Sequence, residues 1–176
     1  MDSSKLSARA MQPGHDRTFL TSEQNFISAL QEILDGFEWR VEDHPRDLAR
    51  MIGGRFGVVP EAKITFKPNG RVMYFEVKKQ GLRGNAEERA AKHRTVQFYK
   101  ELHRITGLDY HPFATIMCES LATAERYTMK HPVFFEPDHY FCWVDYDLDL
   151  LADYLARITT RWMTGSSDGH QELIPE

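Results

Sequence analysis

The amino-acid sequence predicts an α/β fold in which a mixed central β-sheet is flanked by helices. Two β-rich runs joined by an Asn-Gly turn predict a hairpin near the middle of the chain. Two later apolar runs predict buried strands, and segments with helical periodicity lie before, between and after these strands. The expected order is helix, hairpin, helix, two strands, helix, so the helices would cover one sheet.

In the first half of the chain, a helix is expected from Ser22, its N-cap, to just before Gly36. Its apolar stripe consists of Phe26, Ile27, Leu30, Ile33 and Leu34. Residues 39–55 have a mixed pattern, with an indication of helix at residues 47–52. The hairpin joins residues 62–66 to residues 72–78 through the sequence P-N-G at residues 68–70.

In the second half, residues 85–106 are expected to form one long helix that ends at Gly107. Its inward-facing residues would be Ala91, Phe98, Leu102 and Ile105. Strands are expected at residues 112–118 and 140–144. Asp147 would then cap a final helix whose inward residues are Leu148, Leu151, Leu155, Ile158 and Trp162.

The length of 176 residues and the apolar content of 41% fit one packed domain better than two. We expect a flexible N-terminal arm over residues 1–17, a single domain over residues 18–164, and a polar tail over residues 165–176. The chain contains no apolar run of the roughly 20 residues that span a bilayer, and its N-terminus lacks the apolar core of a secretion signal. Cys118 and Cys142 have no CxxC spacing, which favours free, buried thiols. These features predict a cytoplasmic protein without a membrane partner.

Charge is unevenly distributed along the chain, although the net charge is −4. Residues 78–104 contain eight Lys and Arg against three Asp and Glu, whereas residues 133–176 contain nine acidic residues and two Arg. A basic segment on an acidic protein can still bind a polyanion, because salt screens distant charges. The alternative is a solvated helix face without a binding role.

Three charged residues are expected to meet on the hairpin. Side chains alternate between the two faces of a strand, so Glu76 and Lys78 project from the same face. Glu61 follows Pro60 and lies fifteen positions before Glu76, at the start of the partner strand, where the hairpin folds it back beside Glu76. Two carboxylates and an ammonium group would then converge at one end of the sheet.

This combination suits phosphodiester hydrolysis. Carboxylate oxygens hold Mg²⁺, which polarises the phosphate, and a nearby Lys orients or deprotonates the attacking water and offsets negative charge. The short signature of the PD-(D/E)XK nucleases is a proline followed by an acidic residue, then a spacer, and then E-x-K on a strand. The alternative interpretation of the same residues is an ordinary surface ion pair.

The residues that follow resemble the EcoRI/MunI family of type II restriction endonucleases. Residues 75–81 read F-E-V-K-K-Q-G and residues 83–92 read R-G-N-A-E-E-R-A-A-K. In that family the catalytic E-x-K continues into x-Q-G, and a G-N-A-x-E-R-x-x-K segment opens the recognition helix. The close resemblance covers about residues 60–92, with a weaker match at the Y-F-C-W of residues 140–143. Asn85 and Glu88 taken alone would equally suit an ordinary capped helix start.

The resemblance implies a DNA-reading role for the start of this helix. Asn85, Glu88 and Arg89 would read the bases of an AATT-type core, because such side chains match the base edges of the major groove. Arg83 would read a flanking base pair, and Lys92 would hold a phosphate.

The resemblance further implies a restriction-endonuclease-like fold, Mg²⁺ bound by Glu61 and Glu76, catalysis by these two residues with Lys78, and a homodimer that cuts both strands of double-stranded DNA. One departure is Glu61, since the family has Asp after the proline; this puts the metal geometry and the rate in doubt.

Two alternatives stay open. One is a repair or phage nuclease with relaxed sequence preference, and the other is a DNA-binding module with an inactive site.

Overall fold

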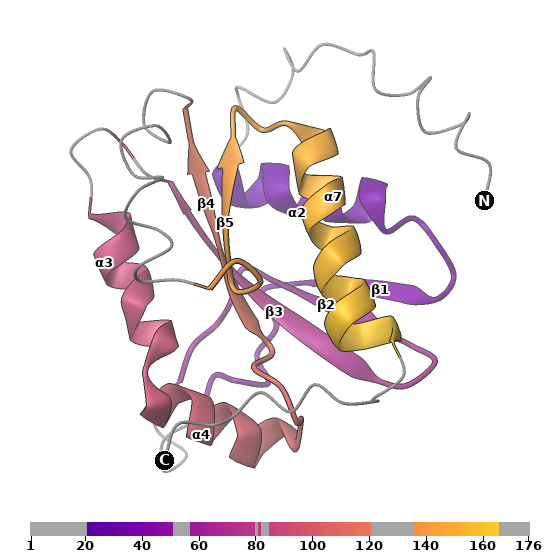
Figure 1. Ribbon diagram of the computed structural model, residues 1–176, viewed down its shortest axis with the longest axis vertical. Helices are drawn as coiled ribbons and strands as arrows, with labels where there is room; N and C mark the ends of the chain where they lie inside the picture. The colour runs from indigo at the N-terminus through magenta and orange to yellow at the C-terminus, as the bar shows by residue number, and fades with distance from the viewer. Residues whose placement is uncertain (1–20, 51–56, 80, 82–84, 121–135, 166–176) are drawn as a thin grey trace.

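The computed structural model describes residues 21–50, 57–79, 81, 85–120 and 136–165, and these contain a five-stranded mixed sheet (Figure 1). The strands follow one another in the order β1 (Trp39–Asp43), β2 (Ala62–Phe66), β3 (Arg71–Lys79), β4 (Phe113–Glu119) and β5 (Tyr140–Val144). Strand β2 pairs antiparallel with both β1 and β3. Strand β4 pairs parallel with both β3 and β5. The predicted fold class, a mixed sheet flanked by helices, is confirmed.

The predicted hairpin is confirmed as β2 and β3. Ala62 pairs with Phe75 and Phe66 pairs with Arg71. The turn between them places Gly70 at φ 74°, a conformation that residues with a Cβ rarely adopt. The turn chemistry of the Asn-Gly pair therefore sets the register of the strand that carries Glu76 and Lys78.

The first helix is α2 (Ser22–Ile33), and its N-cap lies one residue earlier than expected. Thr21, not Ser22, is the N-cap, because its hydroxyl accepts a hydrogen bond from the backbone of Gln24 at 3.2 Å. The Gln24 side chain in return accepts one from the backbone of Thr21 at 3.1 Å, which completes a capping box.

Strand β1 was not predicted from the sequence. It is an edge strand with partly buried and exposed residues, so it lacks the clean alternation that marks a half-buried strand. The helix suggested at residues 47–52 is wrong where the structure describes it, since residues 47–50 form a turn. The remainder of that segment lies outside the described residues.

The long helix expected over residues 85–106 is also wrong, because it is divided into three parts. A short helix α3 (Ala86–Ala90) leads into a 3₁₀ turn η2 (Ala91–Arg94), and α4 (Val96–Thr106) begins anew. Thr95 separates them with an extended ψ of 145°, and its hydroxyl caps α4 by accepting a hydrogen bond from the backbone of Phe98. The break leaves the predicted core residue Ala91 exposed and buries Ala90 instead. Helix α4 ends at Gly107, as predicted.

The last helix, α7 (Leu148–Thr159), is confirmed with its predicted cap Asp147, and it continues into a π-helical turn, η3 (Thr160–Thr164). Leu148 is only partly buried, whereas the other predicted inward residues are buried: Leu151, Leu155, Ile158 and Trp162. Neither cysteine forms a disulfide, as expected, although Cys142 is only partly buried.

In the described part of the chain, helices cover both faces of the sheet (Figure 1). Helices α2 and α7 pack on the face that presents Phe75, Val77 and Ile116, and they form the main core. Helix α4 packs on the opposite face against Tyr74 and Phe113. Helix α3 covers the neighbouring part of that second face. Because β3 alternates, Glu76 and Lys78 belong to the second face, between these two smaller apolar clusters.

In the part of the chain that the structure describes, no helix is both long and apolar enough to cross a membrane. The predicted arm over residues 1–17 and nearly all of the predicted tail from residue 165 lie outside the described residues, so the predicted domain limits stay a prediction.

Candidate active site

Glu61, Glu76 and Lys78 meet on one face of the β2–β3 hairpin. Glu61 directly precedes β2, and because Ala62 pairs with Phe75, Glu61 lies opposite Glu76. The backbone N–H of Val77 donates a hydrogen bond of 2.8 Å to Oε2 of Glu61 and so fixes this carboxylate against β3. The convergence expected from the sequence is therefore present in the structure.

Lys78 bridges the two carboxylates. Its Nζ lies 2.5 Å from Oε1 of Glu76 and 3.3 Å from Oε1 of Glu61. It also donates to the carbonyl oxygen of Val77 at 3.2 Å. Glu76 and Glu61 are only 7% and 9% exposed, so this is not the solvated surface ion pair that was the alternative interpretation.

Burial and mutual repulsion shape the protonation of the group. Burial, and then the negative charge of Glu76, raises the pKa of Glu61, while the Val77 N–H and Lys78 act in the opposite direction. Burial by itself lowers the pKa of Lys78, but the hydrogen bond to Glu76 and the charges of both carboxylates outweigh it and leave the pKa raised. Lys78 is therefore a cation at neutral pH, and it acts as a hydrogen-bond donor.

The donor set fits a hard divalent cation. Two buried carboxylates face a single ammonium group, which leaves one uncompensated negative charge. Within the described residues, the second oxygen of Glu76 has no hydrogen-bond partner. The same residues hold no group of three or more His, Cys, Asp or Glu side chains arranged for a metal ion. Two protein carboxylates suffice for Mg²⁺, which usually takes its remaining ligands from water and substrate phosphates.

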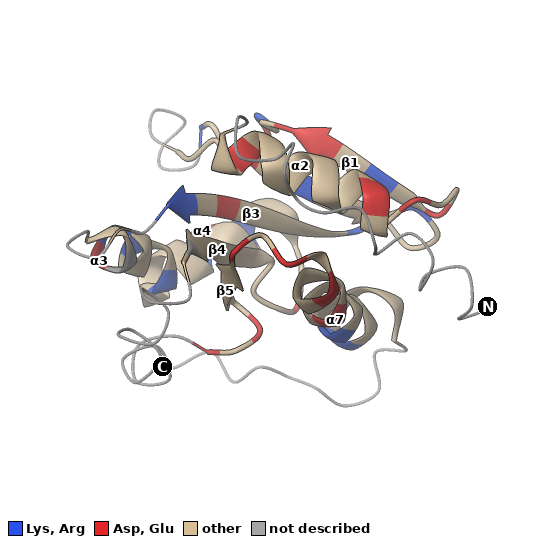
Figure 2. Cartoon of the chain, turned by 90° about the horizontal axis from the view of Figure 1, so that it is seen from above, with Lys and Arg blue, Asp and Glu red and all other residues tan. Residues whose placement is uncertain are grey.

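The predicted DNA-reading residues lie near this group. Asn85, Glu88 and Arg89 are exposed at the start of α3, and Lys92 is exposed on η2. Both views place α3 beside the C-terminal end of β3, and Figure 2 shows Lys and Arg residues at this end of β3 and along the α3–η2 segment. Arg83 lies outside the described residues.

Small residues seat α3 on the sheet. Ala86 and Ala90 are buried against Met117 of β4 and Tyr140 of β5. Because alanine has a short side chain, the helix lies close to the strands, and its polar residues face outward. The exposed side chains at the start of α3 thus stand on a packed base beside the two carboxylates.

Sequence reasoning missed a buried histidine on the face of the sheet that carries Glu76. His93 on η2 is 1% exposed, and the charge of Glu76 acts on it. Within a presumed continuous helix His93 carried no signal of burial, because the break at Thr95 is what turns it inward.

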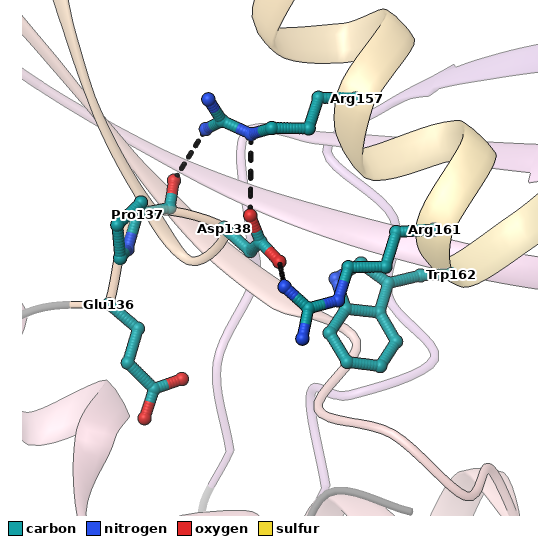
Figure 3. Close-up of a pocket in the computed structure, with 6 residues that line it drawn as sticks. All are labelled: Glu136, Pro137, Asp138, Arg157, Arg161 and Trp162. Carbon is teal, nitrogen blue, oxygen red and sulfur yellow. Dashed lines mark hydrogen bonds and ion pairs between the residues drawn. The ribbon is translucent and has the colours of Figure 1, made fainter. Parts of the chain in front are cut away.

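A separate pocket of about 370 Å³ lies between α7 and the start of β5 (Figure 3). Its Asp138 carboxylate accepts from Arg161 at 2.6 Å and forms an ion pair with Arg157 at 3.3 Å. Arg157 also donates to the carbonyl oxygen of Pro137. None of the predicted site residues lines this pocket, and its charges compensate one another, so it anchors the end of α7 to β5.

No known family model matches the sequence, and no curated protein matches it significantly. The chain is similar to a solved structure described as the crystal structure of MunI restriction endonuclease in complex with cognate DNA. The two share 18% sequence identity, and the superposition covers 91% of this chain and 94% of the other, with a TM-score of 0.64. The chain therefore has a restriction-endonuclease-like fold.

Proposed function

We propose that the protein is a Mg²⁺-dependent endonuclease that hydrolyses phosphodiester bonds of double-stranded DNA, similar to the EcoRI/MunI type II restriction enzymes. The observation that carries the proposal is the convergence of Glu61, Glu76 and Lys78 within hydrogen-bonding distance. The likeness of the fold to a restriction endonuclease supports it.

In this proposal Glu61 and Glu76 hold Mg²⁺ through their carboxylate oxygens. When bound, the ion would act as a Lewis acid on the scissile phosphate. Lys78, charged at neutral pH, donates hydrogen bonds to the phosphate or to the attacking water and offsets the negative charge that develops. The Val77 N–H holds Glu61 in place opposite Glu76.

The proposed specificity belongs to the start of α3. Asn85, Glu88 and Arg89 would contact base edges of an AATT-core palindrome. Arg83 would read a flanking base pair, and Lys92 would hold a phosphate. Cutting both strands of a palindrome requires two-fold symmetry, so the working form is proposed to be a homodimer of one nuclease domain spanning residues 18–164. The corresponding role is cytoplasmic restriction.

The test is cleavage of a plasmid of known sequence in the presence of Mg²⁺ or of EDTA, followed by sequencing of the ends. Wild type should cut only with the metal, and Glu76→Gln should not cut, since the amide keeps the shape but loses the ligating charge. The matched control is Glu42→Gln, a carboxylate that pairs with the strand residue Lys63 outside the site.

Three other results would contradict the proposal in different ways. Cleavage by Glu76→Gln at the wild-type rate would disprove the assignment of the site. Scattered ends without a common sequence would favour a nuclease with relaxed preference. DNA binding by wild type without any cleavage would favour an inactive DNA-binding module.

A further inference from the structure

His93 is a buried polar side chain whose ring has no hydrogen-bond partner among the described residues. It is 1% exposed, and neither ring nitrogen forms a hydrogen bond within the described residues. Its ring packs instead on Phe113, with a centroid distance of 4.6 Å, and on Phe98, at 5.2 Å. Burying a donor and an acceptor without partners costs free energy, so such groups are rare in native proteins and call for an explanation.

The sheet register places this ring at one side of Glu76. On the same face, Glu61 lies opposite Glu76 on the β2 side, and Thr115 of β4 pairs with Glu76 on the other side. Lys78 lies two residues after Glu76 along β3. Phe113, the contact of His93, is two residues before Thr115. His93 therefore packs over the face of the sheet that carries Glu76, at the β4 residue two positions before the strand partner of Glu76. The electrostatic effect of Glu76 on His93 is consistent with this position.

The backbone is anchored at His93 and at the residue that follows it. Nε2 of His111 donates a hydrogen bond of 3.2 Å to the carbonyl oxygen of His93. The next residue, Arg94, forms an ion pair of 3.2 Å with Glu136. The preceding residue, Lys92, is exposed and is the proposed phosphate contact. The proposed phosphate contact therefore lies one residue from His93 in the sequence.

We propose that His93 is a positioning residue that donates a hydrogen bond to the free oxygen of Glu76 when DNA engages the α3–η2 segment, and so couples sequence reading to cleavage. This inference rests on the proposed function. Burial lowers the pKa of His93 to about 4, which keeps the ring neutral near neutral pH, with one N–H donor. Hydrogen bonds of an active site are often long or absent in the free enzyme and form only in its complex.

The test compares His93→Leu, His93→Gln and wild type on a duplex that wild type cuts. Loss of a residue that orients a metal ligand lowers activity about 10–100-fold, so His93→Leu should lose kcat to this extent, with a much smaller loss of DNA affinity in Ca²⁺. His93→Gln, which can donate a hydrogen bond, should recover part of kcat. His139→Leu is the matched control, because His139 is also 1% exposed but stacks on Trp162 instead.

A second measurement does not depend on cleavage or on folding of a variant. In ¹⁵N-histidine spectra of wild type, the His93 ring signals should shift when duplex DNA and Ca²⁺ are added together. Unchanged His93 signals, or a His93→Leu variant with the wild-type kcat, would overturn the inference while leaving the nuclease intact. A wild type that cuts no DNA would instead overturn the proposed function, and this inference with it.

Discussion

Removal of the Lys78 charge should destabilise the protein in a way that depends on pH. Lys78→Met keeps most of the aliphatic stem but removes the ion pairs of 2.5 Å and 3.3 Å to Glu76 and Glu61. At these distances each pair contributes a gross attraction of roughly 5–7 kcal/mol at an effective dielectric constant of about 20. The cost of desolvating the ammonium group, several kcal/mol, offsets part of this.

The net loss can be estimated from the exposure of the group. Breaking a buried ion pair by removing one partner costs about 3–5 kcal/mol. Because the Lys78 side chain is 22% exposed, we expect the free energy of unfolding to fall by an amount near the lower limit, about 3 kcal/mol. This is less than the roughly 5–15 kcal/mol of a typical domain, and the variant should still fold.

The pH dependence follows from Glu61. Its pKa is already raised above 4.5 by burial and by Glu76, and it rises further once Lys78 is neutral. A carboxyl group with a higher pKa in the folded state binds its proton more tightly there. Stability therefore falls as the pH rises from the unfolded-state pKa to the folded-state pKa. The deficit of Lys78→Met should be complete above the raised pKa and should shrink as the pH falls toward 4.5, by about 1.4 kcal/mol for each unit of the added shift.

Urea denaturation followed by tryptophan fluorescence, between about pH 5 and pH 8, measures this deficit. Lys63→Met is the matched control, since Lys63 lies on the same hairpin and also pairs with two carboxylates, those of Glu42 and Asp47. Asp47 is more exposed than Glu61, at 39% against 11% of the side chain, and it keeps its hydrogen bond from Tyr74 when Lys63 is removed. Its pKa should therefore rise less than that of Glu61, and the control deficit should change less over this range. Equal, flat deficits in both variants would refute the argument that Lys78 compensates two coupled carboxylates.

Three further predictions concern metal binding, DNA reading and the helix break. Glu61→Gln should lose Mg²⁺-dependent cleavage, whereas Glu61→Asp should retain it with a changed metal requirement; full activity of Glu61→Gln would move the ligand elsewhere. In Ca²⁺ titrations, Arg89→Ala should lose affinity for an AATT duplex by about 1–3 kcal/mol more than for a control duplex. Lys92→Ala should weaken both duplexes equally and flatten the salt dependence, so an equal loss in Arg89→Ala would make Arg89 a backbone contact. Thr95→Ala should lower the free energy of unfolding by about 1 kcal/mol through loss of the α4 cap, which urea denaturation would detect.

Several features followed from the sequence because they are local. The Asn-Gly turn and the alternation along residues 72–78 predicted the hairpin, and with it the meeting of Glu61, Glu76 and Lys78. Asp147 and a regular apolar stripe predicted α7. In each case neighbouring residues determine the conformation through turn chemistry, capping or periodicity, so no knowledge of distant contacts is needed.

Other features depended on contacts between distant segments. Strand β1 exists because its backbone pairs with β2, whereas its own pattern of burial is weak. The break at Thr95 allows α3 to pack on β4 and β5 while α4 packs on Tyr74 and Phe113, at a different place on the same face. Only this arrangement turns His93 inward, onto Phe113 and Phe98. Local helix propensity favours one continuous helix, but burying apolar surface against the sheet contributes more free energy than the lost turn costs, and so the tertiary structure decides.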